Sequence, residues 1–241
     1  MQIVESEAIV LRTLKYGETS VIAELYTQSH GLKSCIVNGI RSTKNKSGSS
    51  AFQVMNMLEI AFYNKEGDAL CRTKEYHYAV KYHHLGSDVI RTSVGVFLVE
   101  CVRNAILEKE ENPALFAFLK SRFIALDQSP VGQLTEFYLR FLVELSTYLG
   151  FAPLNNFDAD LLPCFHLIHG KFEASHKDPA YLMDEGPSRI LHFILGHDTG
   201  SLPGSKVEKD QLTDDLLRYF ACHLEGFRPV KSLEVLRTIM R

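Results

Sequence analysis

The sequence predicts an α+β protein in which a stretch of β-structure precedes a longer helical region. Two observations support this prediction. Between residues 7 and 78, five short apolar runs rich in β-branched residues follow one another at intervals of roughly ten residues. From about residue 87 onward, apolar residues recur at every third or fourth position, as on the buried face of a helix. We therefore expect two domains, residues 1–81 and residues 82–241.

The five expected strands cover residues 7–12, 20–27, 32–39, 54–63 and 69–78. Short segments with glycine separate several of them, at 15–18, 29–31 and 65–68. Because none of the connections holds a helical crossover, we expect an antiparallel barrel or sandwich. The segment 42–50, STKNKSGSS, has no aliphatic anchor, and we expect it to be mobile.

Helix signals dominate the second domain. Asn112-Pro113 and Ser129-Pro130 each combine a capping side chain with a proline suited to the first turn. The amphipathic run 131–149 ends at Gly150. Residues 151–187 are irregular and interrupted by prolines. Further helices are expected at 188–195, at 214–225 after a Thr213 cap, and at 232–240.

The charge of the chain is distributed unevenly. The net charge of −3 predicts no overall attraction to DNA. However, residues 1–81 hold 10 Lys and Arg against 8 Asp and Glu, whereas residues 82–241 hold 16 against 21. A site for a polyanion is therefore expected in the first domain.

Cysteine usage and hydropathy indicate a cytoplasmic protein. The five cysteines are odd in number and widely scattered, which is typical of a reducing compartment. The N-terminus leads directly into a strand pattern and shows no secretion signal. The longest apolar stretch, 94–106, is interrupted by polar residues and is too short to cross a bilayer.

Neither a metal centre nor a catalytic site is expected. His166 and His169 have the spacing of a zinc-ligand pair, with Cys164 and His176 nearby. A closed zinc site needs four donors, and residues 177–191 contain neither cysteine nor histidine, while His192 and His197 are irregularly spaced. No Gly-x-Ser-x-Gly context is present. We interpret the remaining candidate carboxylates as solvated loop acids: Asp158, Asp160, Asp184 and Glu185.

Basic and aromatic residues alternate in the first domain. Single-stranded nucleic acid is bound by cations that contact phosphates and by aromatic faces that stack on bases. The alternative is that the lysines only solvate loops and the aromatics only fill the barrel. The candidate DNA-binding cations are Arg12, Lys15, Lys33, Arg41, Lys44, Lys46, Arg72 and Lys74. The accompanying aromatics are Tyr16, Tyr26, Phe52, Tyr63, Tyr76 and Tyr78.

Several short strings resemble the N-terminal barrel of the RecO family of bacterial recombination mediators in order and spacing. They are Ala8-Ile9-Val10-Leu11, Tyr16-Gly17-Glu18-Thr19-Ser20, Leu25-Tyr26-Thr27, His30-Gly31-Leu32 and Gly39-Ile40-Arg41. Near the C-terminus, His223-Leu224-Glu225-Gly226 and residues 231–236 resemble the closing motif of the family.

The resemblance implies an OB-fold barrel followed by a helical domain. It also implies a protein without catalysis or cofactor that binds single- and double-stranded DNA, anneals strands and helps to load recombinase in the RecF pathway. The implied partners are RecR and the acidic tail of the single-strand-binding protein, and the implied location is the nucleoid. Arg122 and Arg140, each next to phenylalanines, are candidate contacts for the tail.

One part of the chain departs from the family pattern. Many members carry two Cys-x2-Cys pairs in the C-terminal domain, the first followed by glycine. Here His166-x2-His169-Gly170 takes the place of the first pair, and residues 177–187 offer no second pair. We therefore expect the loop to fold without metal, stabilised by packing around Phe165, Leu167, Phe172 and Tyr181.

Two other functions remain open. In the first, the chain is a protein-interaction adaptor whose DNA contact is incidental. In the second, it is an enzyme, which would require a clustered acid–base or metal site that the sequence does not display. Salt-sensitive binding of an oligonucleotide separates a DNA-binding protein from an adaptor.

Overall fold

The structure is a computed structural model that describes residues 2–40, 48–64, 70–106, 110–175, 178–196 and 200–240. Its contacts divide the chain into two compact units. The first unit comprises Met1–Gln128 and Ser232–Arg241, and the second comprises Ser129–Lys231. Each unit is described by itself.

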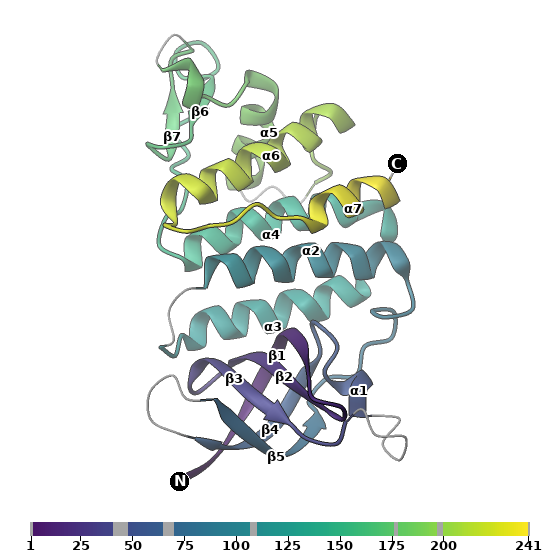
Figure 1. Ribbon diagram of the computed structural model, residues 1–241. Helices are drawn as coiled ribbons and strands as arrows, with labels where there is room; N and C mark the ends of the chain where they lie inside the picture. The colour runs from purple at the N-terminus through teal and green to yellow at the C-terminus, as the bar shows by residue number, and fades with distance from the viewer. Residues whose placement is uncertain are drawn as a thin grey trace. The chain divides into compact units, whose positions relative to one another are not determined.

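The first unit begins with a closed barrel of five strands (Figure 1). The strands are β1 Gln2–Tyr16, β2 Ser20–Thr27, β3 Gly31–Val37, β4 Met57–Asn64 and β5 Cys71–Tyr78. They are hydrogen-bonded in the order β1-β2-β3-β5-β4, and β4 returns to pair with β1. A short helix, α1 Gly48–Ala51, lies between β3 and β4. This arrangement confirms the expected OB-fold.

The barrel closes through one parallel pair, which differs from the purely antiparallel arrangement expected from the short connections. Cys35 and Ile36 of β3 pair with Cys71 and Arg72 of β5. The connection between these two strands includes β4, so it is long enough to reverse the chain twice. Cys35 and Cys71 are buried in the barrel core, as expected for small apolar residues.

Alternation along the strands places one set of side chains inside the barrel. Ala8, Val10, Ala23, Leu25 and Phe62 belong to this core and are inaccessible to solvent. A β-bulge between Val10 and Arg12 shifts the register of β1 against β2. The bulge lets one long strand bend around the barrel and pair with both β2 and β4.

Three helices complete the first unit: α2 Val89–Ala105, α3 Pro113–Gln128 and α7 Ser232–Ile239. Helix α3 lies against the barrel (Figure 1), where Lys120 Nζ is 2.6 Å from Glu7 Oε1 and the ring of Phe116 is 6.2 Å from that of Tyr26. Burial raises the pKa of Tyr26 to about 12. The Asn112 side chain accepts a hydrogen bond from the N–H of Leu115, which confirms the predicted cap.

The second unit is mainly helical and contains one small sheet. Its elements are η1 Val131–Gln133, α4 Leu134–Tyr148, β6 Cys164–His166, β7 Lys171–Glu173, η2 Pro179–Tyr181, α5 Glu185–Leu195 and α6 Lys206–His223. The β6–β7 hairpin lies within the stretch 151–187, for which the sequence predicts only irregular structure. Phe165 and Phe172 face each other across the hairpin and are buried.

The start of α6 corrects one prediction. Thr213 lies inside the helix, where its hydroxyl donates to the carbonyl of Lys209, so it is not a cap. The helix begins after Ser205, whose side chain accepts the N–H of Glu208 while the Glu208 carboxylate accepts the N–H of Ser205. Among the described residues, no helix combines the length and apolarity required to cross a membrane.

Candidate nucleic-acid interface

Several strand ends meet at one end of the barrel. The β1–β2 hairpin turns there, with Tyr16 opposite Ser20. Asn38, which follows β3, bridges to the start of β5. With its amide oriented to satisfy both neighbours, its nitrogen lies 3.1 Å from Ser20 Oγ and its oxygen accepts from Arg72 Nε at 3.1 Å. Arg72 in turn stands opposite Tyr63, near the end of β4.

This end of the barrel carries exposed cations beside aromatic side chains. Arg72 and Lys74 line an open groove of about 440 Å³ together with Tyr63 and Thr73. Lys15 is exposed at the end of β1, and the neighbouring Tyr16 is 47% exposed. Lys74 contacts Glu75 at 3.5 Å, an ion pair in solvent that holds the lysine only weakly. Arg72 and Lys74 thus share one groove, and Lys15 lies at the end of β1, whose hairpin with β2 reaches Asn38 through Ser20.

Arg12 and Lys33 do not join this group. Arg12 lies in the second half of β1, just after the bulge, and its guanidinium is 3.3 Å from the carboxylate of Glu24 on β2. The same carboxylate is 3.1 Å from Arg103 of α2, so two cations share one acid. Lys33 stands opposite Leu25 at the start of β3, the end of that strand away from Asn38. Arg41, Lys44 and Lys46 lie outside the described residues.

A different surface of the barrel is acidic. Glu5, Glu7, Glu59 and Glu75 line a groove of about 430 Å³ with His77 at one side. The strand registers produce this arrangement, because Glu7 stands opposite Glu59 and Glu59 stands opposite His77. Of these acids, Glu7 pairs with Lys120 and Glu75 pairs weakly with Lys74. The groove lined by these carboxylates therefore disfavours a polyanion.

Sequence reasoning missed this acidic surface and missed Asn38. The even balance of charges in residues 1–81 conceals the segregation, although the period of two along β1 and β4 could have placed the glutamates on one face. Asn38 precedes Gly39, whose φ of +70° makes it a turn residue, whereas the apolar pattern indicates only the end of a strand there.

The two arginines expected to contact a partner lie in different units. Arg122 is on α3 of the first unit, with its guanidinium carbon 5.9 Å from the centre of the Phe118 ring. Arg140 is on α4 of the second unit, and its Nη2 donates to the carbonyl of Gly200 at 2.9 Å. Each guanidinium therefore has a contact within its own unit.

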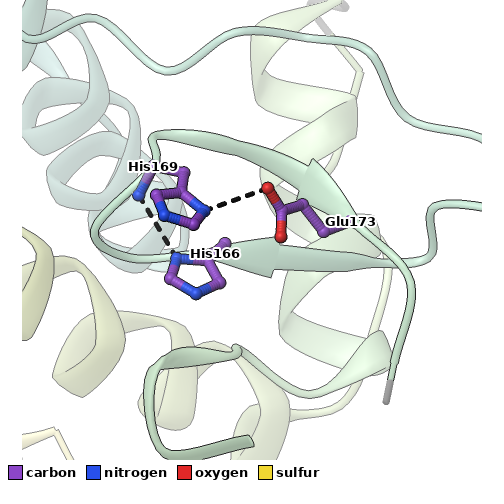
Figure 2. A group of neighbouring side chains, drawn as sticks. All are labelled: His166, His169 and Glu173. Atoms are coloured by element: carbon purple, nitrogen blue, oxygen red, sulfur yellow. Dashed lines mark hydrogen bonds and ion pairs between the residues drawn. The ribbon is translucent and has the colours of Figure 1, made fainter. Parts of the chain in front are cut away.

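The β6–β7 hairpin gathers His166, His169 and Glu173, whose nearest donor atoms lie within 4.8 Å of one another (Figure 2). His166 is 1% exposed, whereas the side chain of His169 is 53% exposed. Burial alone would raise the pKa of the Glu173 carboxyl, but His169 Nδ1, 3.0 Å from Glu173 Oε1, makes the net shift of this pKa downward. Burial and the neighbouring His169 lower the pKa of His166.

These three side chains do not fit a zinc ion. The two imidazole rings are stacked, with centroids 4.0 Å apart and planes only 12° from parallel. A ring nitrogen binds a metal through a lone pair in the plane of its ring, at about 2.0 Å. Two nearly parallel planes separated by a stacking distance cannot both contain one ion at that range. In the described C-terminal region no cysteine cluster supplies other donors.

Two family models cover nearly the whole chain. The model described as Recombination protein O N terminal matches residues 1–79, and the one described as Recombination protein O C terminal matches residues 86–234. The chain belongs to the RecO family. The resemblance noted in the short sequence motifs is thus confirmed, and the first match covers the barrel strands.

Individual members of the RecO family support the same assignment. The DNA repair protein RecO of Christiangramia forsetii is 34% identical over 241 residues, which covers 98% of this chain and 99% of the relative. The DNA repair protein RecO of Flavobacterium psychrophilum is 32% identical, with 98% of each chain covered. That of Bacteroides fragilis is 30% identical, with 96% of each covered.

Proposed function

We propose that this RecO family protein acts in DNA repair and recombination as a non-catalytic mediator. It binds single- and double-stranded DNA, anneals complementary strands and helps to load recombinase in the RecF pathway, working at the nucleoid. The observation that carries the proposal is the groove in which Arg72 and Lys74 lie beside Tyr63. The exposed Lys15 and Tyr16 at the end of β1 are the neighbouring candidates. In OB-folds the loops at such an end commonly bind oligonucleotides.

The charges of the barrel favour DNA binding at the groove with Arg72 and Lys74 over the groove lined by glutamates. Phosphates would be attracted to the exposed cations at the loop end and repelled from Glu5, Glu59 and Glu75. Such contacts are sequence-independent and salt-sensitive. Tyr16 and Tyr63 offer aromatic faces for unpaired bases. Two strands whose backbones are neutralised in this way can approach each other and pair.

A salt titration of a fluorescent oligonucleotide tests this proposal. Changing Arg72 and Lys74 together to alanine should weaken binding to all sequences. It should also flatten the plot of log affinity against log salt by roughly one unit for each phosphate that the variant no longer binds. Lys33→Ala, compared with Lys74→Ala alone, is the matched control, because each removes one lysine charge and Lys33 lies at the other end of β3. If the double variant keeps the wild-type slope, the groove does not bind DNA.

The basic segment after β3 is a second part of the proposed interface. A triple variant should flatten the plot of log affinity against log salt further if this segment contacts bound DNA. The variant replaces Arg41, Lys44 and Lys46 with alanine. Measured alongside the Arg72 and Lys74 variant, the triple variant shows whether the two groups contribute separately. A slope unchanged by the triple substitution would restrict the site to the barrel end.

We also propose that the chain receives RecR and the acidic tail of the single-strand-binding protein. An acidic peptide with an apolar end requires a cation beside an apolar surface. Arg122 with Phe118, and Arg140, are the candidate cations. Arg122→Glu or Arg140→Glu should lower the affinity of a fluorescent tail peptide for the protein several-fold and leave oligonucleotide binding unchanged. If both charge reversals leave peptide affinity at its wild-type value, the tail docks elsewhere.

The acidic surface of β1, β4 and β5 favours an alternative function as a protein-interaction adaptor. This surface suits a basic partner and not DNA. The salt titration separates the alternatives, because an adaptor would bind the oligonucleotide weakly and its affinity would not depend on Arg72 and Lys74.

A further inference from the structure

The turn between β6 and β7 is folded around the side chain of its first residue. His166 Nδ1 accepts hydrogen bonds from the backbone N–H groups of Ile168 and His169, both at 3.2 Å. The carbonyl of His166 also accepts the N–H of Gly170 at 2.9 Å. Gly170 has φ of +64°, which returns the chain to β7. Figure 2 shows the His166 ring beneath the turn, with the N–H of His169 directed at it.

A turn of this shape needs an acceptor at its centre. The N–H groups of residues 168 and 169 point at the buried His166 ring, in a part-buried setting where an N–H without a partner costs free energy. In a Cys-x2-Cys metal site, the metal-bound thiolate of the first cysteine can supply such an acceptor. Here the same position holds an imidazole nitrogen.

The only lone pair of the neutral His166 ring is already occupied by hydrogen bonds and is not available to a metal. A neutral imidazole has one N–H and one lone pair. Because Nδ1 faces two donors, it must be the unprotonated nitrogen, and the proton lies on Nε2. His166 Nε2–H is then itself a buried donor with no partner among the described residues, a cost that the two hydrogen bonds accepted by Nδ1 offset. His169 is oriented by Glu173 and stacks on His166, so it cannot aim at a shared ion.

Backbone pairing holds the segment in which a second ligand pair would stand. The N–H of Leu167 donates to the carbonyl of Tyr181, and the N–H of Met183 donates to the carbonyl of Phe165, each at 2.8 Å. The hairpin therefore gains a third extended segment, and His166 forms an isolated bridge with Leu182. These bonds connect the two halves of the region that a shared metal would otherwise join.

Contacts with α6 fix the turn from its other side. His223 Nε2 is 2.9 Å from the carbonyl of Leu167. A side chain at Gly170 would come within 3.1 Å of the Tyr219 hydroxyl, which itself donates to the carbonyl of Phe151. Phe165 packs against the ring of Tyr219 at 5.4 Å. The turn is thus held on one side by contacts with α6 and on the other by the His166 imidazole.

We propose that in this chain the neutral His166 imidazole replaces a metal ion as the centre of the β6–β7 turn, which makes the hairpin metal-independent. His166 is then a structural acceptor and His169 is its stacked neighbour. Where many family members carry a Cys-x2-Cys pair that suits zinc, this chain thus has an imidazole that stabilises the turn directly.

Ring nitrogen spectroscopy tests the proposal on the unaltered protein. In a ¹⁵N-labelled sample at neutral pH, His166 should show a protonated Nε2 and an unprotonated Nδ1 that receives hydrogen bonds. Protein purified without chelator should contain no stoichiometric zinc, and a chelator should leave its unfolding midpoint unchanged. The opposite tautomer, or one zinc per chain that disappears in His166→Asn, would overturn the proposal.

Two substitutions separate the acceptor from the packing of the ring. His166→Asn keeps an acceptor close to the position of Nδ1, whereas His166→Leu has similar bulk and no acceptor. The leucine variant should have a folding equilibrium constant lower than that of the asparagine variant by several-fold, because two part-buried N–H groups lose their acceptor. Leu161→Asn, at a position of the same unit that is 70% exposed, is the control and should change little. Equal stability of the asparagine and leucine variants contradicts the acceptor role.

Discussion

Asp127 shows how one buried carboxylate orders a whole segment. It lies at the end of α3 and is 4% exposed. Its two oxygens accept the backbone N–H groups of His83, His84 and Leu85 at 2.7 to 2.8 Å. Burial alone would raise the pKa of Asp127, but the three donors outweigh it and the net pKa is lowered. The carboxylate therefore anchors the chain between β5 and α2.

We predict that Asp127→Asn destabilises the protein by about 2–4 kcal/mol, because an amide presents a donor where three N–H groups need acceptors. Urea denaturation at pH 7 measures the loss. Glu18→Gln, in the exposed turn after β1, is the charge control and should stay within about 0.5 kcal/mol of the wild type. A similar effect of both substitutions would show that Asp127 is not an anchor.

Asp215 on α6 shows the opposite balance of forces. Burial raises its pKa to about 6, although Arg218 lies 3.0 Å away and opposes the shift. The folded state therefore binds a proton at Asp215 more readily than the unfolded state does. The stabilisation from this proton is complete below about pH 4 and is lost as the pH rises through about 6.

Asp215→Asn should consequently gain stability relative to the wild type as the pH rises. A shift of about two pKa units corresponds to about 3 kcal/mol, so the difference between the two proteins should change by about 1–3 kcal/mol from pH 4 to pH 8. Unfolding midpoints at the two pH values measure it. Asp214→Asn, at the exposed neighbouring position, should give a difference that changes little. A constant difference for Asp215→Asn would mean that the carboxyl is ionised throughout.

At the scale of elements, the start of α6 is set by two hydrogen bonds between Ser205 and Glu208, which the spacing of apolar residues does not reveal. Ser205 and Glu208 form a capping box. The sequence predicts a start at Thr213 because threonine followed by acids is a common start signal. Thr213 is instead buried on the inner face of the helix. Two signals of the same kind are present, and packing allows the helix to begin at the earlier one.

Ser205→Ala should therefore destabilise the protein by about 1 kcal/mol, whereas Thr213→Ser, which keeps the internal hydroxyl, should preserve the helix start. Amide hydrogen exchange of residues 206–209 provides a local measurement. Exchange there should accelerate in Ser205→Ala and remain slow in Thr213→Ser. The reverse pattern would restore Thr213 as the cap.

At the scale of the whole molecule, the first compact unit extends beyond residue 81, where the sequence predicts a domain boundary. Contacts group α2, α3 and α7 with the barrel, while Ser129–Lys231 forms the second unit. Within the first unit, Tyr26 meets Phe116 of α3, and Met55 fills the space that a side chain at Gly95 of α2 would occupy. The division into a DNA-binding domain 1–81 and a helical domain 82–241 stays a prediction.

A fragment of residues 1–81 should accordingly be less stable than a fragment of residues 1–128. The shorter fragment uncovers Tyr26 and Met55, which are 1% and 4% exposed in the full chain. Thermal unfolding and light scattering of the two fragments compare them directly. If residues 1–81 unfold at the same temperature and remain monomeric, the barrel is an independent domain. Oligonucleotide binding can then be assigned to whichever fragment folds.

The sequence by itself determined the α+β class, the five strands and the position of most helices, because these depend on local periodicity and on caps such as Asn112. It also determined the family, since the short barrel motifs follow one another in the order and spacing typical of RecO proteins. Only the tertiary structure decided which side chains share a surface. Tyr63 and Arg72 come from different strands, and the strand register places them opposite each other, whereas Lys33 lies at the other end of β3. The same register gathers Glu5, Glu59 and Glu75 into an acidic face that a sum of charges cannot reveal. The acceptor role of His166 likewise depends on backbone direction, which side-chain spacing does not encode.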